Sequence, residues 1–327
     1  MNIIRLILLL AAYAFAEGAF SEAPLKSARI GFLGTGPVDT QQPLLDAFRQ
    51  GLRERGWMEG QNLSIEYRLS DEQTFHRFPS LAAELVARRV DLIVATHFPA
   101  AIAAKKATSK IPIVFVTVPD PVAVGLVASL ARPGGNITGL TSTSASLGPK
   151  RMEILKDALP KMSQAAVLFD ANNYEACQFE LDQIKSAGKS LGVNVQAVGV
   201  GSAAELDRAF SAMSQSRAEA LYLSLTPLAF EHRKQILENA AKSRLPVMMD
   251  RHDFADEGSV FAFGASYVEL YRRAAVYVDK ILRGANPATL PVEQPTKFEF
   301  VINLKAAKAQ DISIPQSLLL RADRVIE

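Results

Sequence analysis

Small polar and acidic side chains follow nearly every apolar run that this sequence predicts to be a β-strand. A hydroxyl group can donate a hydrogen bond to a ligand carboxylate, and an acidic side chain can accept one from a ligand ammonium group. In open α/β sheets, ligands bind beyond the carboxyl ends of the strands. The residues at these positions are our candidate binding residues: Thr35, Thr96, His97, Asp120, Ser142, Thr143, Asn172, Tyr174, Ser224, Asp250 and Ser266.

The same residue types are also the usual N-caps of helices, because their side-chain oxygens accept hydrogen bonds from free backbone N–H groups. Asp120 fits this alternative well, since Pro121 follows it and proline favours the first helical position. We expect Asp120 to cap a helix over residues 122–130. At any single position capping is the better explanation. The accumulation of such residues in both halves of the chain is what favours a binding site.

An amino-acid ligand would divide these candidates between its two charged groups. The hydroxyl groups favoured for the carboxylate are those of Thr96, Ser142 and Thr143, with Thr35 next. Asp250 is favoured for the ammonium group and Asp120 is second, although an ion pair with Arg251 is a competing role for Asp250. The aromatic residues that could wall an aromatic ligand are Phe98, Tyr174, Phe254 and Tyr267.

The sequence gives no positive sign of catalysis, a metal or a cofactor. It contains no GxSxG nucleophile motif, and its four histidines, at positions 76, 97, 232 and 252, lack metal-ligand spacing. A dinucleotide fingerprint begun by Gly34 and Gly36 would need glycine at position 39, which is Asp39. The net charge of +2 argues against a nucleic-acid partner. We predict a protein that is not an enzyme.

Apolar runs and amphipathic stretches alternate from residue 29 onward and predict repeated βα units. The strand-like runs cover residues 29–34, 63–69, 91–96, 112–118, 137–141, 165–170, 193–200, 220–225, 246–250 and 259–264. The main helical stretches cover residues 43–55, 77–89, 150–159, 175–191 and 267–283. Several strands are rich in Val, Ile and Leu, as in parallel sheets covered on both faces. We predict an α/β protein with two doubly wound parallel-sheet lobes; a single (β/α)₈ barrel is the alternative.

Residues 1–16 have the pattern of a secretory signal peptide. Arg5 precedes a short apolar stretch, and Ala14-Phe-Ala16 has the small residues that signal peptidase accepts. The lone cysteine, Cys177, excludes an intrachain disulfide and lies far from any mature N-terminus where a lipid could be attached. These features predict cleavage near Ala16 and a soluble protein in the periplasm.

Two long blocks resemble one family of exported proteins. The run VPDPVAVGLVASLARPGGNITGLTS (118–142) and the block from residue 271 to 327 are similar to ABC-transporter substrate-binding proteins of the tryptophan/tyrosine type. The resemblance implies a type I periplasmic-binding-protein fold, in which three crossings join two lobes that close on one small ligand. It also implies an ABC permease with a cytoplasmic ATPase as partner, and a monomer. A periplasmic sensory subunit that signals through a membrane partner is the alternative function.

The resemblance also gives lobe boundaries, with residues 28–140 and 251–285 in the first lobe and residues 141–250 and 286–327 in the second. The tail after residue 290 could pack on one lobe or bridge both. Three segments depart from the common family pattern, and all lie near expected ligand positions: residues 97–98, 224–227 and 261–264. Ligand identity therefore stays open at this stage.

Overall fold

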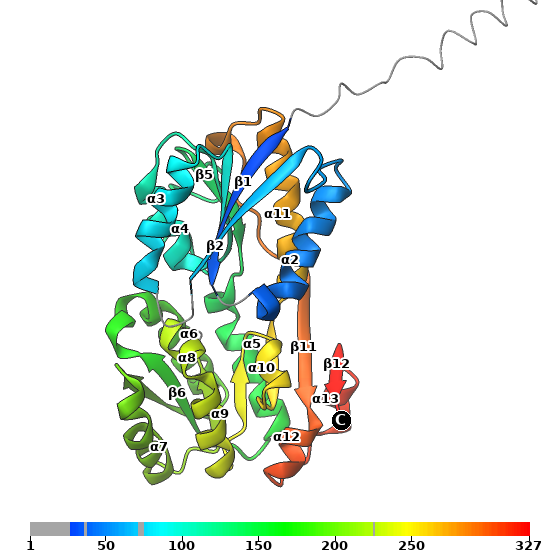
Figure 1. Ribbon diagram of the computed structural model, residues 1–327. Helices are drawn as coiled ribbons and strands as arrows, with labels where there is room; N and C mark the ends of the chain where they lie inside the picture. The colour runs from blue at the N-terminus through cyan, green and yellow to red at the C-terminus, as the bar shows by residue number, and fades with distance from the viewer. Residues whose placement is uncertain (1–26, 36–37, 71–74, 225) are drawn as a thin grey trace, which may run out of the picture.

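The computed structural model describes residues 27–35, 38–70, 75–224 and 226–327, which form two α/β lobes stacked one above the other (Figure 1). The predicted signal peptide lies outside these residues, as do positions 36, 37 and 225 at two of the predicted strand ends. Two separate sheets replace the closed barrel that was the alternative. The prediction of two parallel-sheet lobes is confirmed.

The first lobe contains a five-stranded parallel sheet in the order β2-β1-β3-β4-β5. Its strands are β1 Ala28–Thr35, β2 Leu63–Ser70, β3 Leu92–Thr96, β4 Ile113–Val118 and β5 Ile137–Thr141. Its helices are α2 Val38–Arg53, α3 Phe78–Ala87, α4 His97–Ala107 and α11 Tyr267–Leu282. One apolar core lies between the sheet and helices α2 and α11, and a second lies between the sheet and helices α3 and α4. Helices on both faces explain why these strands carry continuous apolar runs.

The second lobe contains a seven-stranded sheet in the order β12-β11-β10-β9-β8-β6-β7. Its strands are β6 Gln164–Asp170, β7 Asn194–Val200, β8 Ala220–Leu223, β9 Val247–Met249, β10 Phe261–Ala265, β11 Phe298–Asn303 and β12 Arg324–Ile326. All neighbours are parallel except β10 and β11, which pair antiparallel. All ten predicted strands are present, and β11 and β12 are additional.

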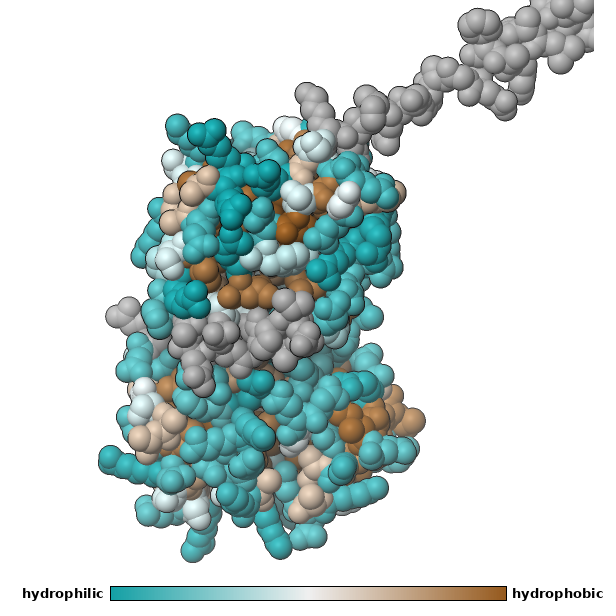
Figure 2. All heavy atoms as spheres, in the orientation of Figure 1, coloured by the Kyte–Doolittle hydropathy of each residue, from teal (hydrophilic) through white to brown (hydrophobic). Residues whose placement is uncertain are grey.

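Helices cover both faces of the second sheet as well. One core includes residues of α5 Gly148–Ala158, α6 Tyr174–Ser190, α12 Leu304–Ala309 and α13 Gln316–Leu319. The other includes residues of α7 Leu206–Gln215, α8 Pro227–Glu231, α9 Arg233–Lys242 and α10 Asp253–Asp256. The face drawn in Figure 2 is hydrophilic over most of both lobes. Within the described residues, no helix has the length and apolar character needed to cross a membrane.

The chain crosses between the lobes after Thr141, at Ser266 and between Glu293 and Phe298. Backbone bonds hold Glu293 beside β5, where its N–H donates to Gly139 O at 3.0 Å, and the N–H of Ser266 donates to Lys297 O at 3.0 Å. The crossings therefore run close together at one side of the lobe boundary. The predicted lobe boundaries differ from this arrangement in two places. Strand β10 pairs within the second sheet, and residues 292–293 lie against the first lobe.

The helix predicted over residues 122–130 is absent. These residues form turns instead, and Asp120 Oδ1 accepts from the N–H groups of Val122 and Ala123 at 3.1 and 3.0 Å. Asp120 thus caps a turn rather than a helix. Gly125 has a φ of +65°, a left-handed conformation that interrupts a right-handed helix within its first residues.

Candidate functional site

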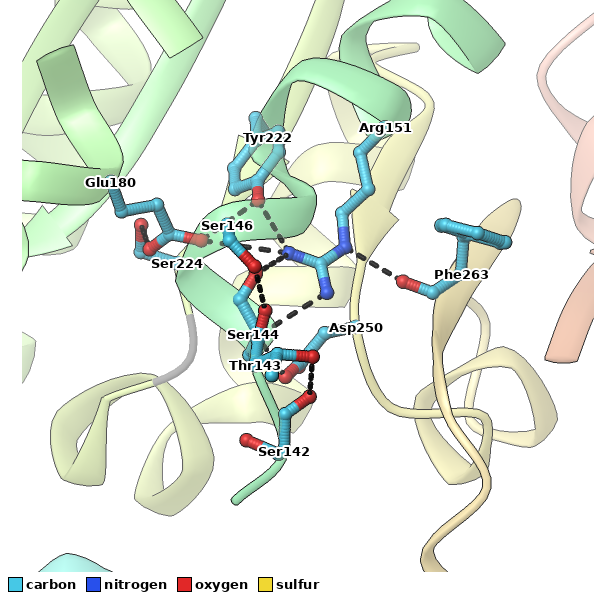
Figure 3. Close-up of polar contacts among 10 residues, drawn as sticks. All are labelled: Ser142, Thr143, Ser144, Ser146, Arg151, Glu180, Tyr222, Ser224, Asp250 and Phe263. Carbon is cyan, nitrogen blue, oxygen red and sulfur yellow. Dashed lines mark hydrogen bonds and ion pairs between the residues drawn. The ribbon is translucent and has the colours of Figure 1, made fainter. Parts of the chain in front are cut away.

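A buried polar network lies where the second sheet meets the first crossing, and Arg151 is at its centre (Figure 3). Its guanidinium donates to the carbonyl oxygens of Phe263 at 2.7 Å and Ser144 at 2.9 Å, and to the Tyr222 hydroxyl at 2.7 Å. Arg151 is only 1% exposed although it follows Lys150 at the start of α5. A buried guanidinium needs such partners, because an unpaired charge away from water is very costly.

Glu180, on α6, balances the charge of Arg151. One carboxylate oxygen accepts from the Tyr222 hydroxyl at 2.8 Å and lies 3.6 Å from Arg151 Nη1, and the other accepts from Ser224 Oγ at 2.7 Å. Burial raises the pKa of Glu180, against the lowering effect of Arg151. Burial also raises the pKa of Tyr222 well above its ordinary value, so the hydroxyl keeps its proton and donates it to Glu180. Tyr222, Asp250 and Glu180 hold the pKa of Arg151 above its ordinary value despite burial.

Asp250 follows β9 and joins this network through the crossing. Its Oδ2 accepts from the Ser144 hydroxyl at 2.5 Å, and Arg151 Nη2 donates to the same hydroxyl oxygen at 3.2 Å. Its Oδ1 is buried and has no hydrogen-bond partner among the described residues. The buried hydroxyl oxygen of Ser142, in the crossing, likewise lacks a partner. Unpartnered buried polar atoms are rare in native proteins, and each needs an explanation such as a ligand, an ion or a bound water.

The ion pair that competed for Asp250 does not form. Arg251 donates instead through Nε to Asp253 at 3.0 Å and through Nη2 to the other oxygen of the same carboxylate. Its guanidinium lies between two rings, 4.7 Å from the centre of Phe230 and 5.3 Å from that of Tyr267. Tyr267 begins α11 in the first lobe, so Arg251 bridges the lobe boundary. Its Nη1 makes no hydrogen bond to a described residue.

His97 and Thr117 lie at the ends of neighbouring strands of the first lobe. His97 Nδ1 is 3.1 Å from Thr117 Oγ1, and both residues have left-handed backbones, with φ of 65° and 62°. Thr117 lies at a bulge where the register between β4 and β5 shifts. A left-handed conformation at a β-branched residue costs about 1–3 kcal/mol and is concentrated at functional sites. Burial lowers the pKa of His97 to about 3, and Arg251 across the boundary contributes in the same direction.

Capping does not explain three of the predicted binding residues. Thr96, Thr143 and Ser266 each precede a helix or helical turn, yet none of their side chains accepts a hydrogen bond from it. The Thr96 hydroxyl instead donates to Leu33 O at 3.5 Å, within the first lobe. Thr35, at the end of β1, makes no hydrogen bond from its hydroxyl to a described residue. These hydroxyl-bearing residues lie at strand ends or crossings that face the lobe boundary.

Other predicted residues have local roles. The side chain of Asn172 is exposed and donates to Gly201 O at 2.7 Å, and Tyr174 is 47% exposed, with its ring 5.7 Å from that of Phe169. Ser224 binds Glu180 within the buried network. The structure thus brings Asp250 and Ser142 near the same crossing and gives Asn172 and Tyr174 contacts at their own strand end.

The sequence analysis missed Arg151, Glu180 and Tyr222. Charged residues on amphipathic helices face solvent by default, and nothing near Arg151 or Glu180 in the sequence marks either as buried. Tyr222 lies within an apolar strand, where the sequence indicates only that its ring packs in the core. No group of three or more metal-binding side chains occurs within the described residues.

Comparisons with known proteins identify the family and the fold. The family profile described as ABC transporter substrate binding protein matches residues 39–326. A tyrosine-binding protein of Clostridioides difficile (strain R20291) is 27% identical over 290 residues, which cover 86% of this chain and 83% of that protein. The structure of a conserved domain protein of Vibrio cholerae is similar over 92% of this chain and 100% of that chain, with a TM-score of 0.83 at 25% sequence identity. The structure of a Streptococcus pneumoniae ABC domain in complex with L-Trp is similar over the same shares of the two chains, with a TM-score of 0.84 at 24% sequence identity.

Proposed function

Since this chain belongs to the family of ABC transporter substrate-binding proteins, we propose that it captures an amino acid and delivers it to an ABC importer. Members of this family are extracytoplasmic receptors for small molecules and not enzymes, and an ABC transporter is their partner. The finer proposal concerns the ligand, the lobe closure and the compartment. We propose an amino acid, closure of the lobes around it, and a monomer in the periplasm after cleavage near Ala16.

The observation that carries the proposal is an unbalanced charge beside an unpartnered oxygen. Glu180 and Asp250 supply two carboxylates to the buried network, and Arg151 supplies one guanidinium. Arg251 and Asp253 neutralise each other separately. One negative charge is therefore left, and Asp250 Oδ1 is the oxygen without a partner. A ligand ammonium group at Oδ1 would supply both the missing charge and the missing donor.

A neutral ligand fits this arrangement less well. A sugar hydroxyl could donate to Oδ1 but would leave the buried carboxylate charge uncompensated, which is costly away from water. The ammonium group of an amino acid compensates it. For the ligand carboxylate, the hydroxyl of Ser142 is the first proposed donor, followed by that of Thr35. The hydroxyls of Thr96 and Thr143 donate to Leu33 O and Ser142 O, so each would have to exchange that bond for one to the ligand. The named ligands of two similar proteins, tyrosine and L-Trp, make aromatic amino acids the first probes.

The distribution of these groups over both lobes supports the proposed closure. Asp250 belongs to the second lobe, while Thr96 and Thr35 end strands of the first. A ligand that contacts both sets binds the closed form better than the open form, and this difference shifts the population toward closure.

Calorimetry and thermal unfolding with each common amino acid, and with neutral sugars, test the proposal. A ligand at about 100 times its Kd adds about 2.7 kcal/mol of stability. Asp250→Asn keeps the shape of the side chain and removes its charge, so we expect the Kd of the amino acid to rise about 30-fold or more. Asp182→Asn, at an exposed position of α6 outside the buried network, is the matched control and should leave the Kd unchanged. Binding of a sugar with no response to amino acids, or an unchanged Kd in Asp250→Asn, would contradict the proposal.

A further inference from the structure

The contact between His97 and Thr117 links the tautomer of His97 to the direction of the Thr117 hydroxyl. Thr117 Oγ1 is 2.7 Å from the carbonyl oxygen of Val116. Only the hydroxyl can donate in this contact, because a carbonyl oxygen has no proton. With the hydroxyl proton directed at Val116 O, Thr117 Oγ1 accepts from His97 Nδ1 at 3.1 Å. In this arrangement His97 is the Nδ1–H tautomer, and its Nε2 is a bare acceptor.

Nothing among the described residues donates to this acceptor. His97 Nε2 makes no hydrogen bond within the described part of the chain, and the ring is only partly buried at the lobe boundary. Arg251 and Asp253 belong to the second lobe, and the Arg251 guanidinium reaches the first lobe at the ring of Tyr267, 5.3 Å from its centre. His97 follows β3 of the first lobe at this boundary, and burial and then the charge of Arg251 lower the pKa of its ring.

Arg251 offers the complementary group on that side. Its Nε and Nη2 are occupied by Asp253, and its guanidinium is held between the rings of Phe230 and Tyr267. This packing fixes the orientation of the guanidinium and leaves the Nη1 donors without a partner among the described residues. An acceptor on one lobe and a donor on the other thus face the same boundary.

We propose that His97 Nε2 and Arg251 Nη1 together recognise one side-chain group of the ligand that both donates and accepts a hydrogen bond, such as a hydroxyl or a carboxamide. The ligand group donates to His97 and accepts from Arg251. A carboxylate is disfavoured because it would meet the Nε2 lone pair, and an ammonium group is disfavoured because it would meet the guanidinium. A purely apolar side chain would leave both polar groups unpaired. This inference rests on the proposed function and adds the chemistry of the side chain.

His97→Asn separates this role from a structural one. Asparagine tolerates the left-handed backbone, and its amide can still donate to Thr117 Oγ1. It lacks a counterpart of Nε2. His76→Asn, at an exposed histidine, is the matched control.

The ligands for the test are pairs of similar shape that differ in one polar group, namely tyrosine with phenylalanine and asparagine with leucine. We expect the unmodified protein to bind the polar member of the pair that it accepts about tenfold more tightly. This preference should fall to near equality in His97→Asn and persist in His76→Asn. A preference that survives in His97→Asn, or tighter binding of the apolar member by the unmodified protein, overturns the inference while the proposed function stands.

A nitrogen-15 NMR spectrum of the imidazole rings tests the tautomer without any ligand. We expect the His97 resonances of an Nδ1–H ring, assigned by their loss in His97→Asn. Resonances of an Nε2–H ring would overturn the inference. Failure of the unmodified protein to bind any amino acid would instead count against the proposed function, and the ring spectrum would still decide the tautomer.

Discussion

Replacing Arg151 by methionine should destabilise the second lobe by at least about 4 kcal/mol. Methionine is unbranched and can occupy much of the same space, but it removes every donor that Arg151 supplies. Removing one partner of a buried ion pair costs about 3–5 kcal/mol, because the other charge stays buried and unpaired. The carbonyl oxygens of Phe263 and Ser144 also lose their donors, and an unsatisfied buried group costs about 1–3 kcal/mol. These costs overlap, so the lower end of their sum is the expected loss.

Glu180→Gln should recover part of this loss in the double variant. Glutamine removes the charge that Arg151→Met leaves unpaired, so the two changes together should cost about 2 kcal/mol less than the sum of the single changes. Lower pH should act in the same direction. Burial raises the pKa of Glu180 above its ordinary 4.5, so its protonated form favours the folded protein, and stability falls as pH rises through the folded pKa. Without Arg151 that pKa rises further, and the deficit of Arg151→Met should shrink from pH 8 to pH 5.

Urea unfolding followed by two probes measures these effects. Circular dichroism reports both lobes, while the single tryptophan, Trp57, is buried in the first lobe and reports that lobe by fluorescence. Arg321→Met is the control, because Arg321 forms an exposed ion pair with Asp157 on the same lobe, and such pairs contribute less than about 1 kcal/mol. If Arg151→Met and Arg321→Met lower stability equally, or if the Arg151–Glu180 coupling is below about 0.5 kcal/mol, the charge argument fails.

Two backbone predictions use the same unfolding assay. Arg217 is exposed and has φ of 54° just after α7, a position where glycine is the usual residue. Arg217→Gly should therefore raise the free energy of unfolding by about 0.5–1 kcal/mol, whereas Arg208→Gly, within α7, should lower it by about 1 kcal/mol. Changes of the same sign in the two variants would refute the reasoning. A Cβ at Gly264 would lie 2.1 Å from Asp250 O, so Gly264→Ala should both destabilise the protein, by about 1–3 kcal/mol, and weaken amino-acid binding. Gly201→Ala, whose Cβ would make only ordinary contacts, should do neither.

The sequence predicts most of the fold because buried parallel strands carry a strong local signal. The runs that became β3 and β4 are continuously apolar, and both faces of each are covered in the structure. β11 carries a shorter signal, since only Phe300, Val301 and Ile302 form a buried apolar run and the strand begins with the exposed Phe298 and the partly exposed Glu299. The helix predicted over residues 122–130 fails for the opposite reason. Its composition suits a helix, and the positive φ of Gly125 is set by the turn it occupies rather than by its apolar neighbours.

The residues of the candidate site also differ in how visible they are in the sequence. Hydroxyl and carboxyl groups at strand ends, such as Thr96 and Asp250, can be proposed from the sequence because apolar runs show where the strands end. Arg151 and Glu180 are not, because each lies on an amphipathic helix among other charged residues, and its burial depends on partners from other elements. Arg151 takes its partners from β8, β10 and the first crossing. That convergence exists only in three dimensions.

The two sets of proposed binding groups differ in how firmly each is held before a ligand arrives. Asp250 is fixed within the second lobe, since Ser144 holds its Oδ2 and Arg151 holds Ser144 by both its hydroxyl and its carbonyl. His97 belongs to the first lobe, and its bond to Thr117 fixes only the ring. A ligand ammonium group can therefore bind a preformed carboxylate in either lobe arrangement, whereas contact with His97 also depends on how the lobes are placed. If the lobes close on the ligand as proposed, Asp250→Asn should weaken binding to the open and closed forms alike, while His97→Asn should act mainly on the closed form.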